Sequence, residues 1–194
     1  MTLDLLDWRR RTFALYAAAR AAADPVEGWR AWRAGRDEMF ATHPQSPVAE
    51  WPAFPGLPFA AYDESLRFVA RVLGAEPAQL DVATSDGVVT LHRVGRLDLP
   101  VGRLDAWWVG GYGGGLFLPF ADATNGAATY GGGRYLLDTV KGADLGGDGG
   151  RLVVDFNFAY HPSCRYSPRW SCPLAPPGNR LAVPVEAGEL MSGG

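Results

Sequence analysis

Residues 80–94, LDVATSDGVVTLHRV, decide the fold class of this chain. Two short apolar runs flank Ser85-Asp86-Gly87, a combination that predicts two antiparallel strands joined by a tight turn. Similar apolar runs recur downstream and upstream, separated by Gly, Pro and Asp. The predicted strands are residues 59–62, 66–73, 80–84, 88–94, 103–109, 116–120, 129–137, 152–158 and 181–185. Their spacing indicates an antiparallel sandwich or a partly closed barrel.

Two helices are predicted ahead of the strands. Residues 3–23 are rich in Ala and carry apolar side chains near helical spacing. Asp24 and Pro25 then provide the N-cap and first-turn proline of a second helix, which Pro44 and Pro47 end. The second helix carries Trp29, Trp32 and Phe40, with Arg30, Arg33 and Arg36 interleaved. We interpret Arg30 and Arg33 as part of a solvated helix face.

These elements predict an α+β fold dominated by β-structure. A helical segment covers residues 1–45, and the β region with a C-terminal signature covers residues 46–190. The whole chain of 194 residues has the length of one domain and can bury a hydrophobic core. No linker divides it, so we expect a single domain over residues 1–194.

Composition excludes several classes of partner. Hydrophobic residues make up 47% and charged residues 20%, which is typical of a globular protein. The net charge of −3 gives no general attraction to nucleic acid. No apolar run reaches the roughly 18 residues that a membrane helix needs. Asp4 and Asp7 interrupt the first apolar residues and the arginines follow them, which is the wrong order for a secretory signal. We therefore expect a cytoplasmic protein without nucleic-acid or membrane partners.

Glycine is concentrated in one part of the chain. Fourteen of the 25 glycines fall between Gly110 and Gly150. None of them fits G-x-G-x-x-G or the phosphate-binding loop pattern, so no nucleotide cofactor is predicted. Tight turns and close backbone approach explain them better.

Three longer motifs occupy the C-terminal half. FADATNGAATYGGGR spans Phe120–Arg134, DFNFAYHP spans Asp155–Pro162, CPLAPPGNRL spans Cys172–Leu181, and Ala187-Gly188-Glu189 follows. With these motifs and weaker matches upstream, the chain resembles the family called domain of unknown function 1684 over roughly residues 29–190. The resemblance implies no established activity. The family usually has Asn where this chain has His161, so a role for that Asn does not carry over.

Polar residues of these motifs form the candidate site. Strand alternation places Tyr130 and Arg134 on one face of residues 129–137. In residues 152–158, alternation places Asp155 and Asn157 opposite the aromatic side chains. Our hypothesis is that Arg134 meets Asp155 across neighbouring strands. The candidate ligand-binding residues are Asp122, Thr124, Tyr130, Arg134, Asp155, Asn157 and Tyr160.

Two interpretations of this cluster stay open. Buried polar groups are costly without partners, so Arg134 and Asp155 can belong to a closed structural network. Alternatively, they can line a polar pocket in which Arg134 binds a carboxylate or phosphate group of a ligand. Glu189 is interpreted as a surface charge or a structural hydrogen-bonding group.

Cys164 and Cys172 are separated by seven residues in a Pro-rich, aromatic loop. A disulfide, packed free thiols and a metal site shared with His161 are the alternatives. The spacing fits no recognised zinc pattern, so we predict a loop thiol pair or staple and no metal. A nucleophilic pair of Cys164 with His161 is a further idea. The Asn that the family has at that position argues against shared catalysis.

Three functions follow from these residues. The leading hypothesis is a small-molecule-binding domain for a polar or anionic ligand, without a cofactor. The second is a hydrolase or lyase with Asp122 or Asp155 as base and Tyr130 as acid. The third is a structural or protein-interaction domain. Its N-terminal helix would then contact a partner or a second copy of the chain through Leu3, Leu5, Leu6 and Trp8.

Overall fold

The computed structural model describes residues 2–85 and 87–191. It begins with two helices, α1 (Thr2–Ala21) and α2 (Pro25–Thr42). The side chain of Asp24 accepts a hydrogen bond of 2.9 Å from the backbone N–H of Val26, and Pro25 occupies the first turn of α2. The predicted helical pair and its capping residue are therefore confirmed.

Two antiparallel sheets follow the helices. The five-stranded sheet has the order β2 (Gln79–Thr84), β3 (Gly87–Leu99), β4 (Gly102–Val109), β5 (Gly115–Phe120) and β6 (Arg134–Asp138). The three-stranded sheet has the order β1 (Arg67–Arg71), β8 (Arg151–Asp155) and β7 (Gly147–Asp148). The mainly-β, α+β class is confirmed, and the two sheets do not close into a barrel.

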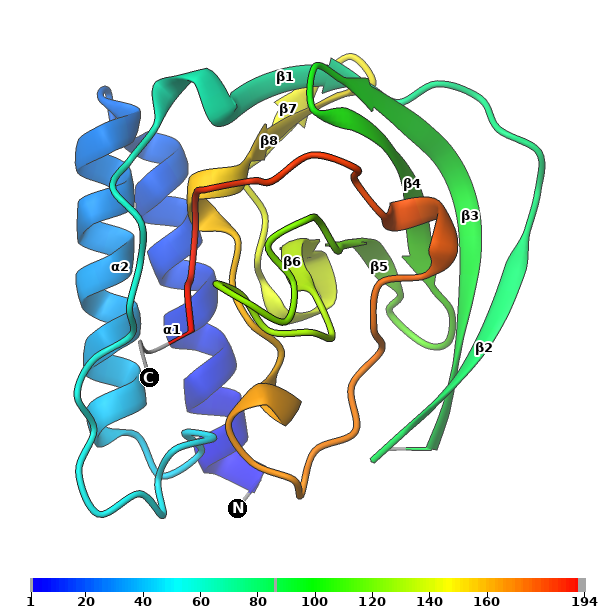
Figure 1. Cartoon of the computed structure of the whole chain (residues 1–194). Coiled ribbons are helices and arrows are strands. Elements are labelled where there is room, and N and C mark those ends of the chain that lie inside the picture. The colour runs from blue at the N-terminus through cyan, green and yellow to red at the C-terminus, as the bar shows by residue number, and fades with distance from the viewer. Residues whose placement is uncertain (1, 86, 192–194) are drawn as a thin grey trace.

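The main hydrophobic core joins the two sheets. Leu104 and Leu118 from the larger sheet pack in one cluster with Val154 from the smaller sheet. Leu181 and Val185 of the irregular C-terminal segment complete that cluster. In Figure 1 this segment, drawn in red, runs from the strands towards the helices, which stand on the flank opposite β2 and β3.

The predicted strand over residues 129–137 begins only at Arg134. Three glycines precede Arg134, and Gly133 has a φ of +90°, which an extended strand does not use. The predicted strand over residues 152–158 ends at Asp155. The carboxylate of Asp155 accepts a hydrogen bond from the backbone N–H of Asn157 and starts a 3₁₀ turn over Phe156–Phe158. Strand alternation therefore fails for Tyr130 and for Asn157.

Two other predicted strands form no regular strand. In residues 59–62, only Phe59 pairs with another segment, in an isolated bridge with Glu189. Residues 181–185 are irregular. The predicted turn at residues 85–87 includes Asp86, which lies outside the described residues. Around it, Thr84 pairs with Gly87, so the antiparallel pairing of β2 and β3 is confirmed.

The helices pack on the β-structure through aromatic residues. Trp32 lies 4.8 Å from Phe158 and 5.7 Å from Tyr16, measured between ring centroids. The indole N–H of Trp29 donates a hydrogen bond of 2.9 Å to the backbone carbonyl of Asn157. No helix in the described ranges has the length and apolar character to cross a membrane.

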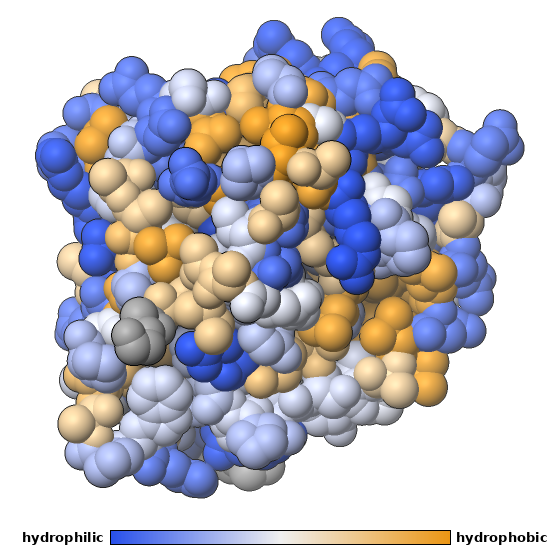
Figure 2. Space-filling view, viewed as in Figure 1, coloured by the Kyte–Doolittle hydropathy of each residue, from blue (hydrophilic) through white to orange (hydrophobic). Residues whose placement is uncertain are grey.

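The start of α1 exposes apolar side chains. Leu3, Leu5 and Leu6 are exposed, which self-association through this helix would require. On the face seen in Figure 2, apolar residues lie in separate patches between polar ones rather than in one continuous apolar surface.

Gly133 gives a direct test of this architecture. A Cβ at this position would lie 2.5 Å from the carbonyl oxygen of Phe120 on the neighbouring strand. We expect Gly133→Ala to lower the free energy of unfolding by about 3 kcal/mol or more, from strain and steric overlap together. Gly56→Ala is the control, because Gly56 has a similar φ of +91° and open space around it. Its expected loss is about 1 kcal/mol. Equal losses in urea denaturation of the two variants would contradict the proposed close approach at Gly133.

Candidate functional site

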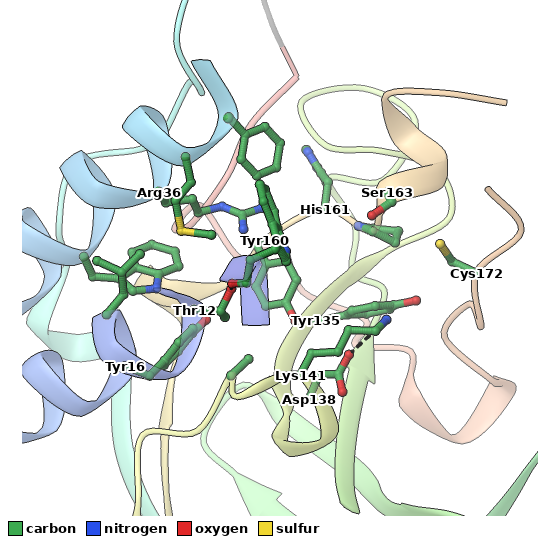
Figure 3. Close-up of a pocket in the computed structure, with 17 residues that line it drawn as sticks. Thr12, Tyr16, Arg36, Tyr135, Asp138, Lys141, Tyr160, His161, Ser163 and Cys172 are labelled. Carbon is green, nitrogen blue, oxygen red and sulfur yellow. Dashed lines mark hydrogen bonds and ion pairs between the residues drawn. The ribbon is translucent and has the colours of Figure 1, made fainter. Parts of the chain in front are cut away.

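A cavity of about 90 Å³ lies between the helical pair and the β-structure. Its wall comes from α1, α2, β6, the turn after β6, and residues 160–163 with Cys172. Figure 3 shows its polar side chains. They are Thr12, Tyr16, Arg36, Tyr135, Asp138, Lys141, Tyr160, His161, Ser163 and Cys172.

Helical spacing explains why these side chains meet. Trp8, Thr12 and Tyr16 follow one another at intervals of four residues in α1 and all line the cavity. Trp32, Arg36 and Phe40 have the same spacing in α2 and also line it. Residues four apart lie on one face of a helix, so each helix turns one such face to the cavity.

Arg36 is the central cation of the cavity wall. Its guanidinium lies 4.5 Å from the ring centroid of Phe40 and 4.8 Å from that of Tyr160. Its Nη2 donates a hydrogen bond of 3.3 Å to Oε2 of Glu189. The Nε atom of Arg36 is buried and has no hydrogen-bond acceptor among the described residues. One N–H of a charged group is therefore unpaired next to the cavity.

Tyr16 contributes a second unpaired polar group. The residue is 2% exposed, and its hydroxyl makes no hydrogen bond of normal geometry within residues 2–85 and 87–191. The neighbouring Trp32 indole meets the phenol ring edge-on and has a small lowering influence on the pKa of Tyr16. Burial raises the pKa of Tyr16, so its hydroxyl stays protonated. It can thus donate one hydrogen bond and accept others.

Glu189 anchors the opposite side of Arg36. Glu189 is 1% exposed, and its Oε2 accepts a hydrogen bond of 3.0 Å from the backbone N–H of His161. Its Oε1 accepts a hydrogen bond from the hydroxyl of Tyr166. Burial alone would raise the pKa of this carboxyl, but Arg36, His161 and Tyr166 lower it to about 2. The carboxylate is therefore ionised and holds Arg36 in place.

His161 belongs to the same network. Its Nε2 accepts a hydrogen bond of 3.2 Å from the backbone N–H of Tyr130, which places the ring proton on Nδ1 in the neutral form. The Nδ1 atom lies 3.7 Å from Oε1 of Glu189. His161 thus links the loop before β6 to Glu189, which is a positioning role.

Lys141 and Asp138 form the other polar end of the cavity. Nζ of Lys141 lies 3.4 Å from Oδ2 of Asp138, as the dashed line in Figure 3 marks. Beside them, the hydroxyl of Tyr135 donates a hydrogen bond to the backbone carbonyl of Pro173. Each cation on the cavity wall, Arg36 and Lys141, therefore has its own carboxylate.

Arg134 lies in a buried network away from this cavity, and its Nε atom has no hydrogen-bond partner among the described residues. Its side chain and that of Asp122 are 0% exposed, with 2.6 Å between Nη2 and Oδ2. The guanidinium also donates to the backbone carbonyls of Val185, at 2.9 Å, and of Ala187. It does not meet Asp155, so the predicted Arg134–Asp155 pair is wrong. The partner is Asp122, because β6 lies beside β5, and Asp122 follows β5 by two residues.

Asp122 and Thr124 complete that network. Oδ1 of Asp122 accepts a hydrogen bond of 2.6 Å from the backbone N–H of Thr124, and a second from its hydroxyl. The hydroxyl of Thr124 also lies 2.8 Å from that of Thr129. Both carboxylate oxygens of Asp122 therefore have partners, Thr124 in the loop after β5 and Arg134 in β6, and these contacts hold the loop and the strand together.

Asp155 and Asn157 form a second closed network. Asp155 accepts hydrogen bonds from the hydroxyl of Tyr62 at 2.9 Å and from the side-chain amide of Asn157 at 2.8 Å. The same amide group of Asn157 exchanges two hydrogen bonds with the backbone of Asp63. These contacts fix the segment before β1 against the end of β8. Burial, the largest influence, raises the pKa of Asp155.

The structure divides the remaining predicted residues between two places. Tyr160 lines the cavity, as does Cys172. Tyr130 lies outside it, with its hydroxyl 3.9 Å from Sγ of Cys164. Cys164 and Cys172 are both free, half-buried thiols. No group of three or more His, Cys, Asp or Glu side chains in the described part of the chain could hold a metal ion.

Sequence reasoning did not select Tyr16 or Arg36 as site residues. The four-residue spacing of Trp32, Arg36 and Phe40 was the available signal, because residues four apart share one helix face, and this spacing places Arg36 on the same face as two aromatic residues. Glu189 carried a clearer signal, since it closes the last motif of the chain. It is a buried hydrogen-bonding group rather than a surface charge.

The Arg134–Asp122 pair can be tested by substitution. We expect Arg134→Met to lower the free energy of unfolding by about 3–5 kcal/mol, because it leaves a buried carboxylate without its cation. Arg103→Met is the matched control. It removes an ion pair with Asp98 in which both side chains are more than half exposed, and should change stability by less than about 1 kcal/mol. Similar losses for the two variants in urea denaturation would argue against a structural role for Arg134.

Glu189 should give the protein a defined acid sensitivity. Its pKa falls from 4.5 to about 2 on folding, so its contribution to stability is complete above pH 4.5 and disappears as the pH falls towards 2. We expect the free energy of unfolding to decline less steeply across this range in Glu189→Gln than in wild type. Glu186→Gln, at an exposed position three residues earlier, should keep the wild-type slope. An unchanged slope in Glu189→Gln would contradict the lowered pKa.

Comparison with known proteins agrees with the sequence motifs. The family model described as protein of unknown function (DUF1684) matches residues 52–190. The solution NMR structure of an uncharacterised protein from Haloarcula marismortui is 37% identical in sequence, with a TM-score of 0.59. The match covers 84% of this chain and 91% of that chain. No curated protein matches. The chain therefore belongs to the DUF1684 family of proteins of unknown function.

Proposed function

We propose that this protein binds a small polar molecule in the cavity between the helical pair and the β-structure. One observation carries the proposal: Oη of Tyr16 and Nε of Arg36, two of the four buried side-chain atoms without a partner among the described residues, belong to residues that line this cavity. The other two, Nε of Arg134 and Nε1 of Trp170, belong to residues that do not line it. Buried polar groups in folded proteins are nearly always hydrogen-bonded. Two unpaired atoms beside one cavity therefore favour a bound ligand that completes their hydrogen bonds.

The size of the cavity limits the ligand. Its volume of about 90 Å³ is below the roughly 150 Å³ of an engineered cavity that admits benzene. It is also well below the roughly 300 Å³ at which pockets for drug-sized ligands begin. The ligand, or the part of it that enters, therefore has only a few non-hydrogen atoms.

The charges on the wall suggest the chemistry of that ligand. Arg36 and Lys141 are balanced by Glu189 and Asp138, so the wall carries no excess formal charge. The unpaired groups are an N–H of Arg36 and a protonated hydroxyl of Tyr16. Both can donate to oxygen, so a carboxylate or carbonyl group is the best match. Aromatic rings around Arg36 would cover the apolar part of the ligand.

This proposal moves the ligand site away from most residues selected from the sequence. Tyr160 stays in the site, whereas Arg134, Asp155 and Asn157 have partners within the protein. The alternative of a hydrolase or lyase needs Asp122 or Asp155 as a free base. Backbone N–H groups of Thr124 and Asn157 already occupy these carboxylates, which argues against that role.

The variant Tyr16→Phe tests ligand binding without an expected loss of stability. The substitution removes only the unpaired hydroxyl, so the ligand-free variant should be as stable as wild type or slightly more stable. Affinity for a ligand that accepts this hydrogen bond should fall about tenfold, equivalent to about 1.4 kcal/mol. We would measure binding of formate, acetate, propionate and lactate by two-dimensional NMR, following the Arg36 Nε–H and tryptophan indole signals.

Tyr112→Phe is the control, because Tyr112 is fully exposed. It should bind each carboxylate as wild type does. Ethanol and isopropanol, which lack a carboxylate, should bind more weakly to wild type than acetate and lactate do. The proposal is wrong if no carboxylate shifts these signals at millimolar concentration, or if Tyr16→Phe and wild type bind equally well.

A further inference from the structure

Two cysteine thiols lie together at the edge of the cavity, outside every network described above. Cys164 is in a 3₁₀ turn, Ser163–Arg165, and Cys172 follows after seven residues. The side chains of the two cysteines interact, and each shifts the pKa of the other. Both are free and half-buried, so a small reagent can reach them and neither is locked in the core.

A third group completes the arrangement. The hydroxyl of Tyr130 lies 3.9 Å from Sγ of Cys164, on the loop before β6. The pKa of Tyr130 is raised, with burial as the largest cause, so it keeps its proton and can donate to sulfur. Cys164 thus has two side-chain donors, the thiol of Cys172 and the phenol of Tyr130, whereas the backbone N–H of Cys164 donates to Cys172.

The loop that carries Cys172 has a fixed position. The backbone N–H of Ser171 donates a hydrogen bond of 2.8 Å to the hydroxyl of Ser85, and the N–H of Ser85 donates one of 3.1 Å to the carbonyl of Ser171. The residue before Cys172 is therefore anchored to Ser85, which follows β2.

We propose that Cys164 and Cys172 form a redox-responsive dithiol that a peroxide converts to an intramolecular disulfide, with Cys164 as the reacting thiol and Cys172 as the resolving thiol. The asymmetry of the site supports these roles. The hydrogen bonds from Cys172 and Tyr130 outweigh burial and lower the pKa of Cys164 to about 6, whereas the pKa of Cys172 is raised. A thiol with a lowered pKa has a larger thiolate fraction at pH 7 than an ordinary thiol, which is only a few per cent ionised.

The reaction has two steps. The Cys164 thiolate attacks one oxygen of hydrogen peroxide, so that an S–O bond forms, the O–O bond breaks, and hydroxide leaves and is protonated to water. Cys172 then attacks the sulfur of the Cys164 sulfenic acid, so that the S–S bond forms and the S–O bond breaks. The departing hydroxide takes the proton of Cys172 as a second water. The two thiols lose two electrons in total, and the peroxide gains them.

The experiment treats the full chain with hydrogen peroxide and follows thiol number and intact mass. Wild type should lose both thiols and two mass units, and dithiothreitol should restore them. Cys172→Ser keeps a hydroxyl donor beside Cys164 and should stop at the sulfenic acid, which dimedone traps. Cys164→Ser should react at least about tenfold more slowly than Cys172→Ser, because burial still raises the pKa of Cys172 and the Tyr130 hydroxyl lies beside Cys164.

Tyr130→Phe tests the positioning role of the phenol. Alkylation of Cys164 by iodoacetamide, measured against pH in the Cys172→Ser background, should move to a higher midpoint when Tyr130 is replaced. Circular dichroism of each variant checks that it is folded. The proposal fails if peroxide-treated wild type keeps both thiols or forms only intermolecular disulfides. Equal peroxide reactivity of the two single cysteine variants would also overturn it.

Discussion

The buried ion pair of Arg134 with Asp122 supports much of the architecture. Its guanidinium also binds the backbone carbonyls of Val185 and Ala187, so one side chain joins the first residue of β6 to the irregular C-terminal segment. That segment has no strand partner of its own to satisfy these carbonyls. Because Glu189 follows two residues after Ala187, the same contact places the carboxylate that holds Arg36. The position of Arg36 in the candidate site thus depends on the ion pair of Arg134 with Asp122, which does not line the cavity.

Local sequence signals predicted the fold well where hydrogen bonds are local. Asp24 and Pro25 marked the start of α2, and the turn signal at residues 85–87 marked the pairing of β2 with β3. Predictions of strands failed where a side chain or a glycine conformation replaces the hydrogen bonds between neighbouring strands. Asp155 caps a 3₁₀ turn, and the glycines before Arg134 delay the start of β6. The irregular C-terminal segment forms only isolated backbone hydrogen bonds with other segments, such as Leu181 with Ala121 and Glu189 with Ala159, and the Arg134 side chain binds carbonyls between them.

The candidate site was harder to predict, for a physical reason. The C-terminal motifs correctly marked buried polar residues such as Arg134 and Asn157, but strand alternation cannot tell a closed network from a pocket wall. That distinction depends on partners far away in the sequence. Asp122 was such a partner for Arg134, and Tyr62 was one for Asp155. Tyr16 lies in α1 and Arg36 in α2, and only the packing of these helices shows that their polar atoms lack partners among the described residues.

The contact between Arg36 and Glu189 spans 153 positions of the chain. Closing a loop of that length has a large entropic cost, which must be met before the contact itself contributes any stability. The helices and hairpins, whose contacts are short in sequence, can form without it. We therefore expect the cavity to form after the local contacts of the helices and hairpins. A chain that has its secondary structure but not yet its final C-terminal contacts would still expose the aromatic face of α2 to solvent and to other chains.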